Sequence, residues 1–123
     1  MLVLRSAQLR QMEEQSRRSF GRRLARHLEE SFPEECARLG DDEVRRMCSQ
    51  GVDRAQSHGF RSERDICKFL NLIVVFGFEF DRELPWAVGI LAVDDPSPER
   101  MERLYAAALE AAEIADQGIL GGR

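Results

Sequence analysis

The sequence predicts an all-α fold, a compact bundle of about five or six helices around a central apolar helix. Large apolar residues recur three or four positions apart through most of the 123 residues, which is the spacing of an amphipathic helix. No stretch with the alternation of a β-strand competes convincingly with this pattern. The run at residues 66–76 is apolar on nearly all sides, so we expect it at the centre of the bundle.

Composition favours a single folded domain. With 43% hydrophobic and 33% charged residues, the chain lies in the range of soluble globular proteins. A chain of this length buries about two-thirds of the surface that it exposes when unfolded, so no disulfide is needed to hold it together. We predict one helical domain over residues 1–117 and a flexible, glycine-containing C-terminal tail over residues 118–123.

The first predicted helix covers residues 6–32, with Ser6 as its N-terminal cap and Pro33 at its end. Glu13 and Glu14 lie four residues before Arg17 and Arg18, the spacing of ion pairs on a solvated helix face. The apolar stripe of this helix consists of Leu9, Met12, Phe20, Leu24, Leu28 and Phe32.

Glycine and proline divide the middle of the chain. We expect a short helix over residues 33–39 that ends at Gly40, and a longer helix over residues 41–58 that ends at Gly59. Gly51 lies inside that second helix, where its missing side chain permits close contact with another helix.

The remaining helices are predicted from their caps and apolar stripes. Ser62, three residues before Asp65, is a cap for the central helix, which extends to residue 76. Pro85 opens a brief helix that ends at Leu91. Ser97 followed by Pro98 begins the last helix, whose stripe reaches Ala112.

The segment from Ile66 to Trp86 holds five of the nine aromatic residues. Trp86 follows Leu84 and Pro85 and is an anchor under either of two interpretations, a core side chain or an interface hot spot. We favour the core, because a small domain needs its large apolar groups inside. The intervening charged residues would then form the exposed acidic part of a loop: Glu79, Asp81, Arg82 and Glu83.

Charge is uneven along the chain. Residues 1–64 carry 13 basic and 11 acidic side chains, and residues 65–123 carry 5 basic and 11 acidic ones. The strongest basic cluster lies on the first predicted helix. Nucleic-acid binding is one interpretation of that helix, but an acidic protein without interleaved aromatic residues more often uses such a face to contact its own carboxylates or an acidic partner. The cluster comprises Arg10, Arg17, Arg18, Arg22, Arg23 and Arg26.

Catalytic and metal chemistry have little support in the sequence. The three cysteines and two histidines are scattered, without the paired spacing of a zinc site. His27 lies in the arginine-rich first helix, and His58 lies at a helix C-terminus, where an imidazolium interacts favourably with the helix dipole, so the fold accounts for both. Cys48 or Cys67 would need an adjacent base to act as a nucleophile. We expect a non-enzyme with no metal and no cofactor. No secretory signal or membrane-spanning run is visible, so we predict a cytoplasmic location.

Several segments together are similar to a family. They are residues 32–36 (FPEEC), 51–55 (GVDRA) and 58–65 (HGFRSERD), together with Gly77 and the short sequences Phe80-Asp81 and Leu84-Pro85-Trp86-Ala87. This pattern resembles small uncharacterised helical bacterial proteins encoded near type VI secretion effector genes. The resemblance covers nearly the whole chain. It implies no catalytic residues, and it implies an accessory role as an adaptor that helps load an effector or as an immunity protein that neutralises a toxin.

We therefore expect a non-catalytic, protein-binding accessory factor, an adaptor or chaperone for a secreted bacterial effector. The alternatives are an immunity protein and a nucleic-acid-binding protein that uses the arginine-rich helix. The expected partner is another protein, namely an effector, a toxin or a spike component. The residues predicted to contact it are Arg18, Arg22, Arg26, Glu79, Asp81, Arg82, Glu83 and Trp86.

Overall fold

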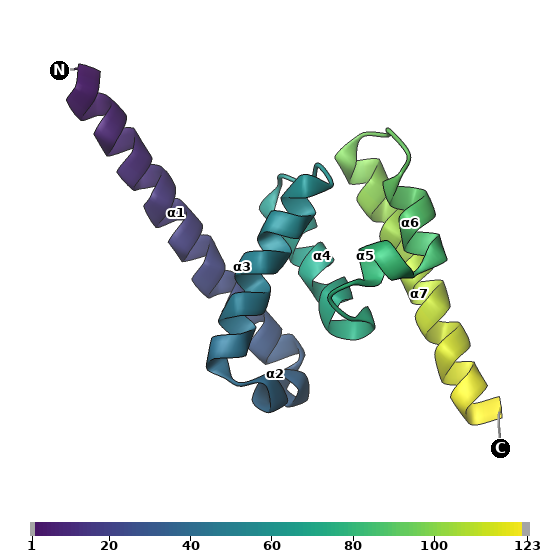
Figure 1. The fold of residues 1–123 in the computed structure, drawn as a ribbon. Coiled ribbons are helices and arrows are strands. Elements are labelled where there is room, and N and C mark those ends of the chain that lie inside the picture. The colour runs from purple at the N-terminus through teal and green to yellow at the C-terminus, as the bar shows by residue number, and fades with distance from the viewer. Residues whose placement is uncertain (1, 122–123) are drawn as a thin grey trace. The chain divides into compact units, whose positions relative to one another are not determined.

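The computed structural model describes the backbone of residues 2–121 and the side chains of residues 5–117. Within those residues the regular elements are seven helices, with no strand, which confirms the all-α prediction (Figure 1). We predicted about five or six helices, and the described residues form seven. The helices are α1 (Leu2–Ser31), α2 (Pro33–Leu39), α3 (Asp41–Ser57), α4 (Glu63–Phe76), α5 (Phe80–Glu83), α6 (Pro85–Leu91) and α7 (Ser97–Gly121).

The chain divides into two compact units, residues 1–50 and residues 51–123. The first unit contains α1, α2 and the beginning of α3, and the second contains the end of α3 and helices α4 to α7. A single domain over residues 1–117 stays a prediction. Helix α7 continues to Gly121, past the start of the tail expected at residue 118, and residues 122–123 lie outside the described part of the chain.

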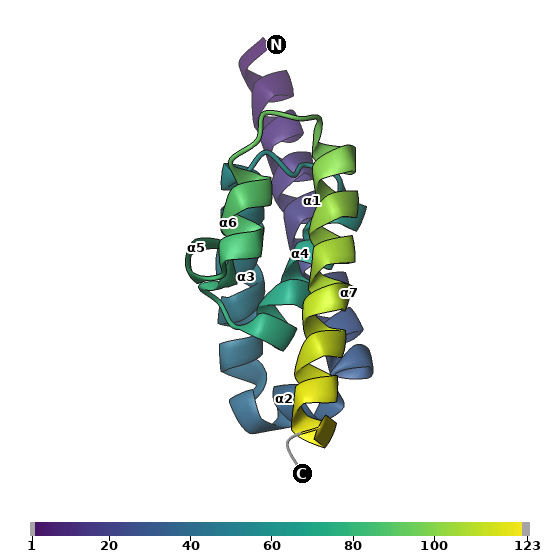
Figure 2. The same ribbon diagram turned by 90° about the vertical axis from the view of Figure 1, so that its right-hand side faces the viewer.

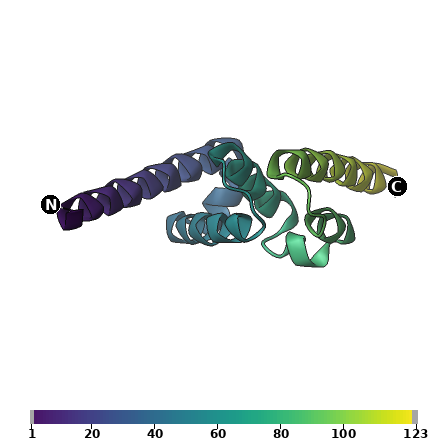
Figure 3. The same cartoon turned by 90° about the horizontal axis from the view of Figure 1, so that it is seen from above.

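In the first unit, one face of the C-terminal half of α1 is buried, whereas the N-terminal half is exposed. Leu24 and Leu28 are buried, whereas Leu9 and Met12 expose 65% and 64% of their surface. Figure 3 shows the N-terminal half of α1 extending away from α2. The helix begins at Leu2, so Ser6 lies inside it and the predicted cap at Ser6 is wrong. The leucine and arginine residues before Ser6 are good helix formers, and they allow the helix to start earlier.

Short-range signals set the boundaries of α2 as predicted. Pro33 occupies the first turn of α2, where a missing N–H costs nothing. Gly40 follows the helix with a φ of 85°, a conformation that disfavours residues with a Cβ atom. Its backbone N–H donates to the carbonyl of Cys36 and so satisfies one of the last free carbonyls of the helix.

In the second unit, α4 supplies more of the buried side chains than any other helix. The Ser62 side chain accepts a hydrogen bond from the backbone N–H of Asp65 at 3.1 Å, which confirms the predicted cap. Phe69 is fully buried, and its ring centroid lies 6.0 Å from that of Phe60 and 5.1 Å from that of Phe80. The buried residues of α4 are Asp65, Ile66, Phe69, Leu70, Leu72 and Ile73.

The start of α7 is tied to the connection between α3 and α4. The Ser97 hydroxyl donates to the carbonyl of Gly59 at 2.8 Å, and the Arg100 guanidinium donates to the carbonyl of His58 at 2.6 Å. Arg100 also lies over the ring of Phe60, 5.0 Å from its centroid. Figure 2 shows α6 lying alongside α7, and the two helices are in contact.

Gly51 permits the close approach of α3 and α4. A Cβ atom at this position would lie 2.6 Å from one methyl carbon of Leu70 and 3.1 Å from the Cδ1 of Ile73. Both of those side chains are buried and have little room to move. The spacing therefore agrees with the close helix contact predicted for Gly51.

Replacing Gly51 by alanine is expected to destabilise the protein by up to about 2 kcal/mol. Overpacking a core costs about 1–3 kcal/mol, which exceeds the gain of about 1 kcal/mol in helix propensity. The matched control is Gly21→Ala in α1, where an added Cβ meets nothing within 4 Å, so the propensity gain stands alone. Urea unfolding followed by circular dichroism measures both changes. Equal stabilisation by the two substitutions would contradict this account of the α3–α4 contact.

Candidate functional site

The second unit contains a part-buried cluster of charged and polar side chains, named here the Arg54–Asp81 cluster, which consists of Arg54, His58, Glu79 and Asp81. Arg54 lies in the last turn of α3, His58 directly follows the end of that helix, and Asp81 lies on α5. Asp81 is only 4% exposed. The expectation that Asp81 belongs to an exposed loop is therefore wrong, because α5 turns this carboxylate toward α3.

Hydrogen bonds occupy both carboxylate oxygens of Asp81. Arg54 Nη1 donates to Oδ1 at 2.8 Å and to Oδ2 at 3.1 Å, and His58 Nε2 lies 2.8 Å from Oδ2. Because an ionised carboxylate only accepts hydrogen bonds, the proton of this last bond resides on Nε2. Glu79 makes longer contacts with the same guanidinium, at 3.4 and 3.5 Å. The guanidinium also lies 4.7 Å from the ring centroid of Phe78.

The contacts within the cluster favour the ionised forms of Asp81 and Arg54. Burial alone raises the pKa of Asp81, but the hydrogen bonds from His58 and Arg54 and the charge of Arg54 outweigh it and hold that pKa below its usual value. For Arg54, burial lowers the pKa, but the hydrogen bonds to Asp81 and Glu79 more than compensate and raise it. A charged pair with its polar atoms satisfied thus joins α5 to α3.

The lowered pKa of Asp81 predicts a loss of stability in acid. A carboxyl whose pKa is lower in the folded protein than in the unfolded chain stabilises the fold above the unfolded pKa of about 3.9. That stabilisation is lost as the pH falls through the folded pKa. We expect the free energy of unfolding to decline below about pH 4, and to decline less steeply in Asp81→Asn, which does not titrate. Equal slopes for the two proteins between pH 5 and about pH 3 would contradict the assignment.

The geometry of the cluster suits a structural contact that holds α5 in place better than it suits a catalytic site. Both oxygens of Asp81 are occupied, and its side chain has no exposed surface. Among the described residues, every buried side-chain nitrogen or oxygen has a hydrogen-bond partner. The cluster therefore fixes the position of α5, and with it the exposed Arg82 and Glu83.

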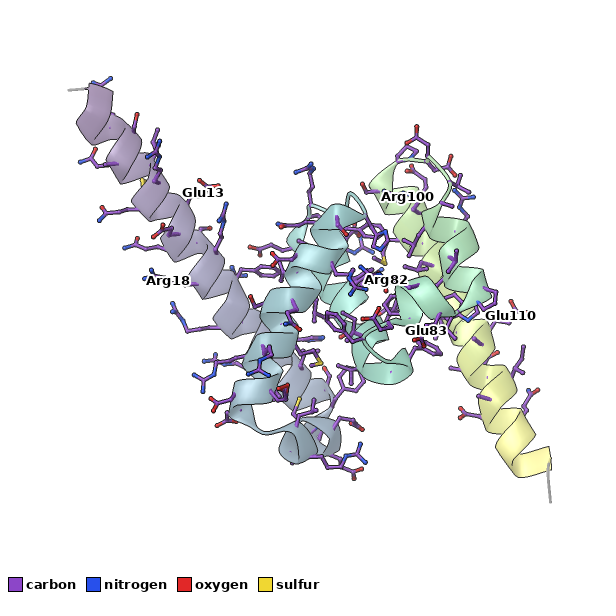
Figure 4. All side chains as sticks on the ribbon, in the orientation of Figure 1. Glu13, Arg18, Arg82, Glu83, Arg100 and Glu110 are labelled. Carbon is purple, nitrogen blue, oxygen red and sulfur yellow. The ribbon has the colours of Figure 1, made fainter. Side chains whose placement is uncertain are left out.

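The predicted contact residues fall into two groups. Arg18, Arg22 and Arg26 are exposed on α1, in the first unit, and Figure 4 shows Arg18 pointing away from the helix. The remaining residues lie in the second unit and differ in exposure. Arg82 and Glu83 are exposed on α5, Glu79 is half-buried against Arg54 and Arg82, and Asp81 is buried. The partner-binding role of the exposed residues stays a prediction.

Trp86 is half-buried and belongs to an aromatic chain. Its ring centroid lies 5.2 Å from that of Phe76 in an edge-on arrangement and 6.4 Å from that of Phe80 in a stacked one. These contacts agree with the core role that the sequence favours. The exposed part of the indole leaves the interface alternative open.

The Arg54–Asp81 cluster includes two residues that sequence reasoning did not single out for this role. Arg54 was assigned none, and His58 was expected to interact with a helix end. Their spacing of four residues was the available signal, because it places both side chains on one helix face. The partner of that pair, Asp81, is 23 residues beyond His58 and has no local pattern that identifies it.

Cys67, a candidate nucleophile in the sequence, is half-buried on α4. Burial raises the pKa of the Cys67 thiol, which reduces the thiolate fraction that a nucleophile requires. In the part of the chain that the structure describes, no three His, Cys, Asp or Glu side chains are grouped to hold a metal ion. None of the described helices has the length and apolar character needed to cross a membrane.

The exposed half of α1, residues 5–18, is the other candidate surface, and it belongs to the first unit. Every side chain in this segment is exposed. Arg17 pairs with Glu13 at 3.0 Å and Arg18 with Glu14 at 3.7 Å, which confirms the ion pairs predicted on this helix.

In comparisons with known proteins, no family model, curated protein or solved structure matched this chain.

Proposed function

We propose that this protein is a non-catalytic binding factor that contacts another protein through the exposed half of α1. One observation carries the proposal. Residues 5–18 are helical and exposed on every side, and they include Leu9 and Met12 at 65% and 64% exposure. A helix of that length is marginal in water without tertiary contacts, so it gains stability when a partner covers it.

Charge narrows the class of partner. Residues 5–26 carry seven arginines and two glutamates, so an acidic protein surface fits this helix best. We propose that this protein is a cytoplasmic adaptor or chaperone for a secreted bacterial effector. Its acidic partner is then the effector or a spike component.

Affinity purification of the tagged full-length protein from its host tests the proposal. We expect Arg17→Glu/Arg18→Glu, which breaks the ion pairs with Glu13 and Glu14, to lose a recovered partner while the helix content stays unchanged. The matched control is Arg45→Glu/Arg46→Glu on α3, which makes the same charge change and breaks comparable exposed ion pairs with Asp42 and Glu43. Loss of the partner in the control as well, or in neither variant, contradicts a specific role for α1.

A second exposed surface is tested in the same experiment. Glu83→Arg changes an exposed charge on α5, whereas a change at Glu79 would also disturb the contact with Arg54. We therefore expect Glu83→Arg to leave the fold intact and to report only on binding. If this variant alone loses the partner, the contact lies on α5.

Two cellular assays separate the proposed adaptor from the alternatives. An adaptor is required for export of its effector, whereas an immunity protein protects cells that express a toxin. A nucleic-acid-binding protein would instead bind DNA or RNA with a steep dependence on salt. Protection without any effect on export would replace the adaptor proposal by the immunity alternative.

A further inference from the structure

The exposed half of α1 has an excess of positive charge, so an acidic surface is the one that would bind it best. Residues 5–18 contain Arg5, Arg10, Arg17 and Arg18 against two glutamates. Leu9 and Met12 are one turn apart and lie on one face of the helix, and Arg5 precedes Leu9 by one turn. A complementary surface therefore combines apolar contact with negative charge.

The C-terminal part of α7 has that combination. Residues 106–117 carry three acidic side chains and no basic one, namely Glu110, Glu113 and Asp116. Leu109 and Ile114 expose 60% and 61% of their surface in the same segment. Figure 4 shows Glu110 on the outer side of α7. The two segments are of similar length, about 20 Å each at 1.5 Å per residue.

We propose that this protein associates with a second copy of itself, and that the exposed half of α1 of one copy packs against residues 106–117 of the other. In a two-fold dimer this contact occurs twice, since each copy supplies one basic and one acidic segment. Opposite charges favour this pairing over a contact between two basic α1 helices. The proposal rests on the proposed function in one respect: the same α1 surface is used, so another partner protein would compete with the second copy.

Sedimentation equilibrium of the purified full chain, over about 1 to 200 µM, tests self-association without any other partner. We expect a reversible monomer–dimer equilibrium that weakens as salt increases. Leu9→Gln/Met12→Gln is expected to raise the dissociation constant about tenfold or more, since apolar contacts near an interface centre dominate binding. The matched control is Leu39→Gln on α2, an exposed leucine at 44% that lies outside both segments, which should leave the constant unchanged.

A charge exchange identifies the two surfaces. Arg5→Glu/Arg10→Glu and Glu110→Arg/Glu113→Arg are each expected to weaken the dimer about tenfold, because each places like charges opposite one another. Combining all four substitutions is expected to restore most of the wild-type affinity. Circular dichroism of each variant checks that the helices are intact.

Three results would overturn the proposal. The first is a monomer at every concentration, and the second is a dimer that neither charge reversal weakens. The third is a dimer weakened by both reversals but not restored by their combination. A monomer that still recovers an α1-dependent partner from its host would reject the second copy and leave the proposed function standing.

Discussion

Replacing Asp81 by alanine is expected to lower the free energy of unfolding by about 3–5 kcal/mol, the range for removing one partner of a buried ion pair. The Arg54 side chain is only 13% exposed, and without Asp81 it keeps only the longer contacts to Glu79 and its position over the Phe78 ring. His58 loses its acceptor at the same time. Domains of this kind have a total stability of about 5–15 kcal/mol, so the loss is a large fraction of it.

Urea unfolding of Asp81→Ala measures this loss, and Glu83→Ala is the matched control. Glu83 is an exposed carboxylate on the same short helix, and truncating it should change stability by less than about 0.5 kcal/mol. A loss below about 1 kcal/mol in Asp81→Ala would contradict a stabilising role for the cluster.

A double variant separates the net contribution of the ion pair to the free energy of unfolding from the cost of leaving one charge buried and unpaired. Arg54→Met/Asp81→Leu removes both charges and keeps apolar volume between α3 and α5. We expect it to be more stable than Asp81→Ala, because apolar replacement of a whole buried pair is often neutral. If the double variant is the less stable of the two, the cluster contributes net stability through its hydrogen bonds.

Truncation of Phe69 to alanine is the second change with a large expected effect, a loss of about 3–5 kcal/mol. The ring is fully buried and lies between His58, Phe60 and Phe80, with centroid distances of 5.8, 6.0 and 5.1 Å. Its removal leaves a cavity that these neighbours cannot close unless the α3–α4 connection or α5 moves. The near-ultraviolet circular dichroism signal should also fall as the aromatic contacts are lost.

Val75→Ala is the control for Phe69→Ala. Val75 lies on the same helix but is 54% exposed, so its truncation removes little buried surface. We expect a change below about 0.5 kcal/mol. Phe69→Leu should fall between the two, because leucine fills part of the cavity. A similar loss for Phe69→Ala and Val75→Ala would mean that α4 is not the centre of the second unit.

Most of the secondary structure was predictable from the sequence, because its signals act over one or two turns. The apolar stripes, Pro33 and Ser62 give helix positions within a few residues of those observed. These features depend on backbone geometry and local hydrogen bonds, which the neighbouring residues determine. The four-residue helix α5 was missed, since a single turn has no apolar period to recognise.

Tertiary structure alone decided which charges are buried. Glu79, Asp81, Arg82 and Glu83 are equivalent as a sequence pattern, yet only Asp81 is buried, because the turn at Gly77 and helix α5 direct it toward Arg54 and His58. The exposure of Leu9 and Met12 was equally unpredictable. Apolar residues at helical spacing predict a buried helix face, but the pattern does not show whether another helix covers that face. The sequence determined the helices and their apolar faces through local chemistry. The burial of Asp81 and its pairing with Arg54 and His58 depend on residues 23 to 27 positions apart, so only the folded chain could assign them.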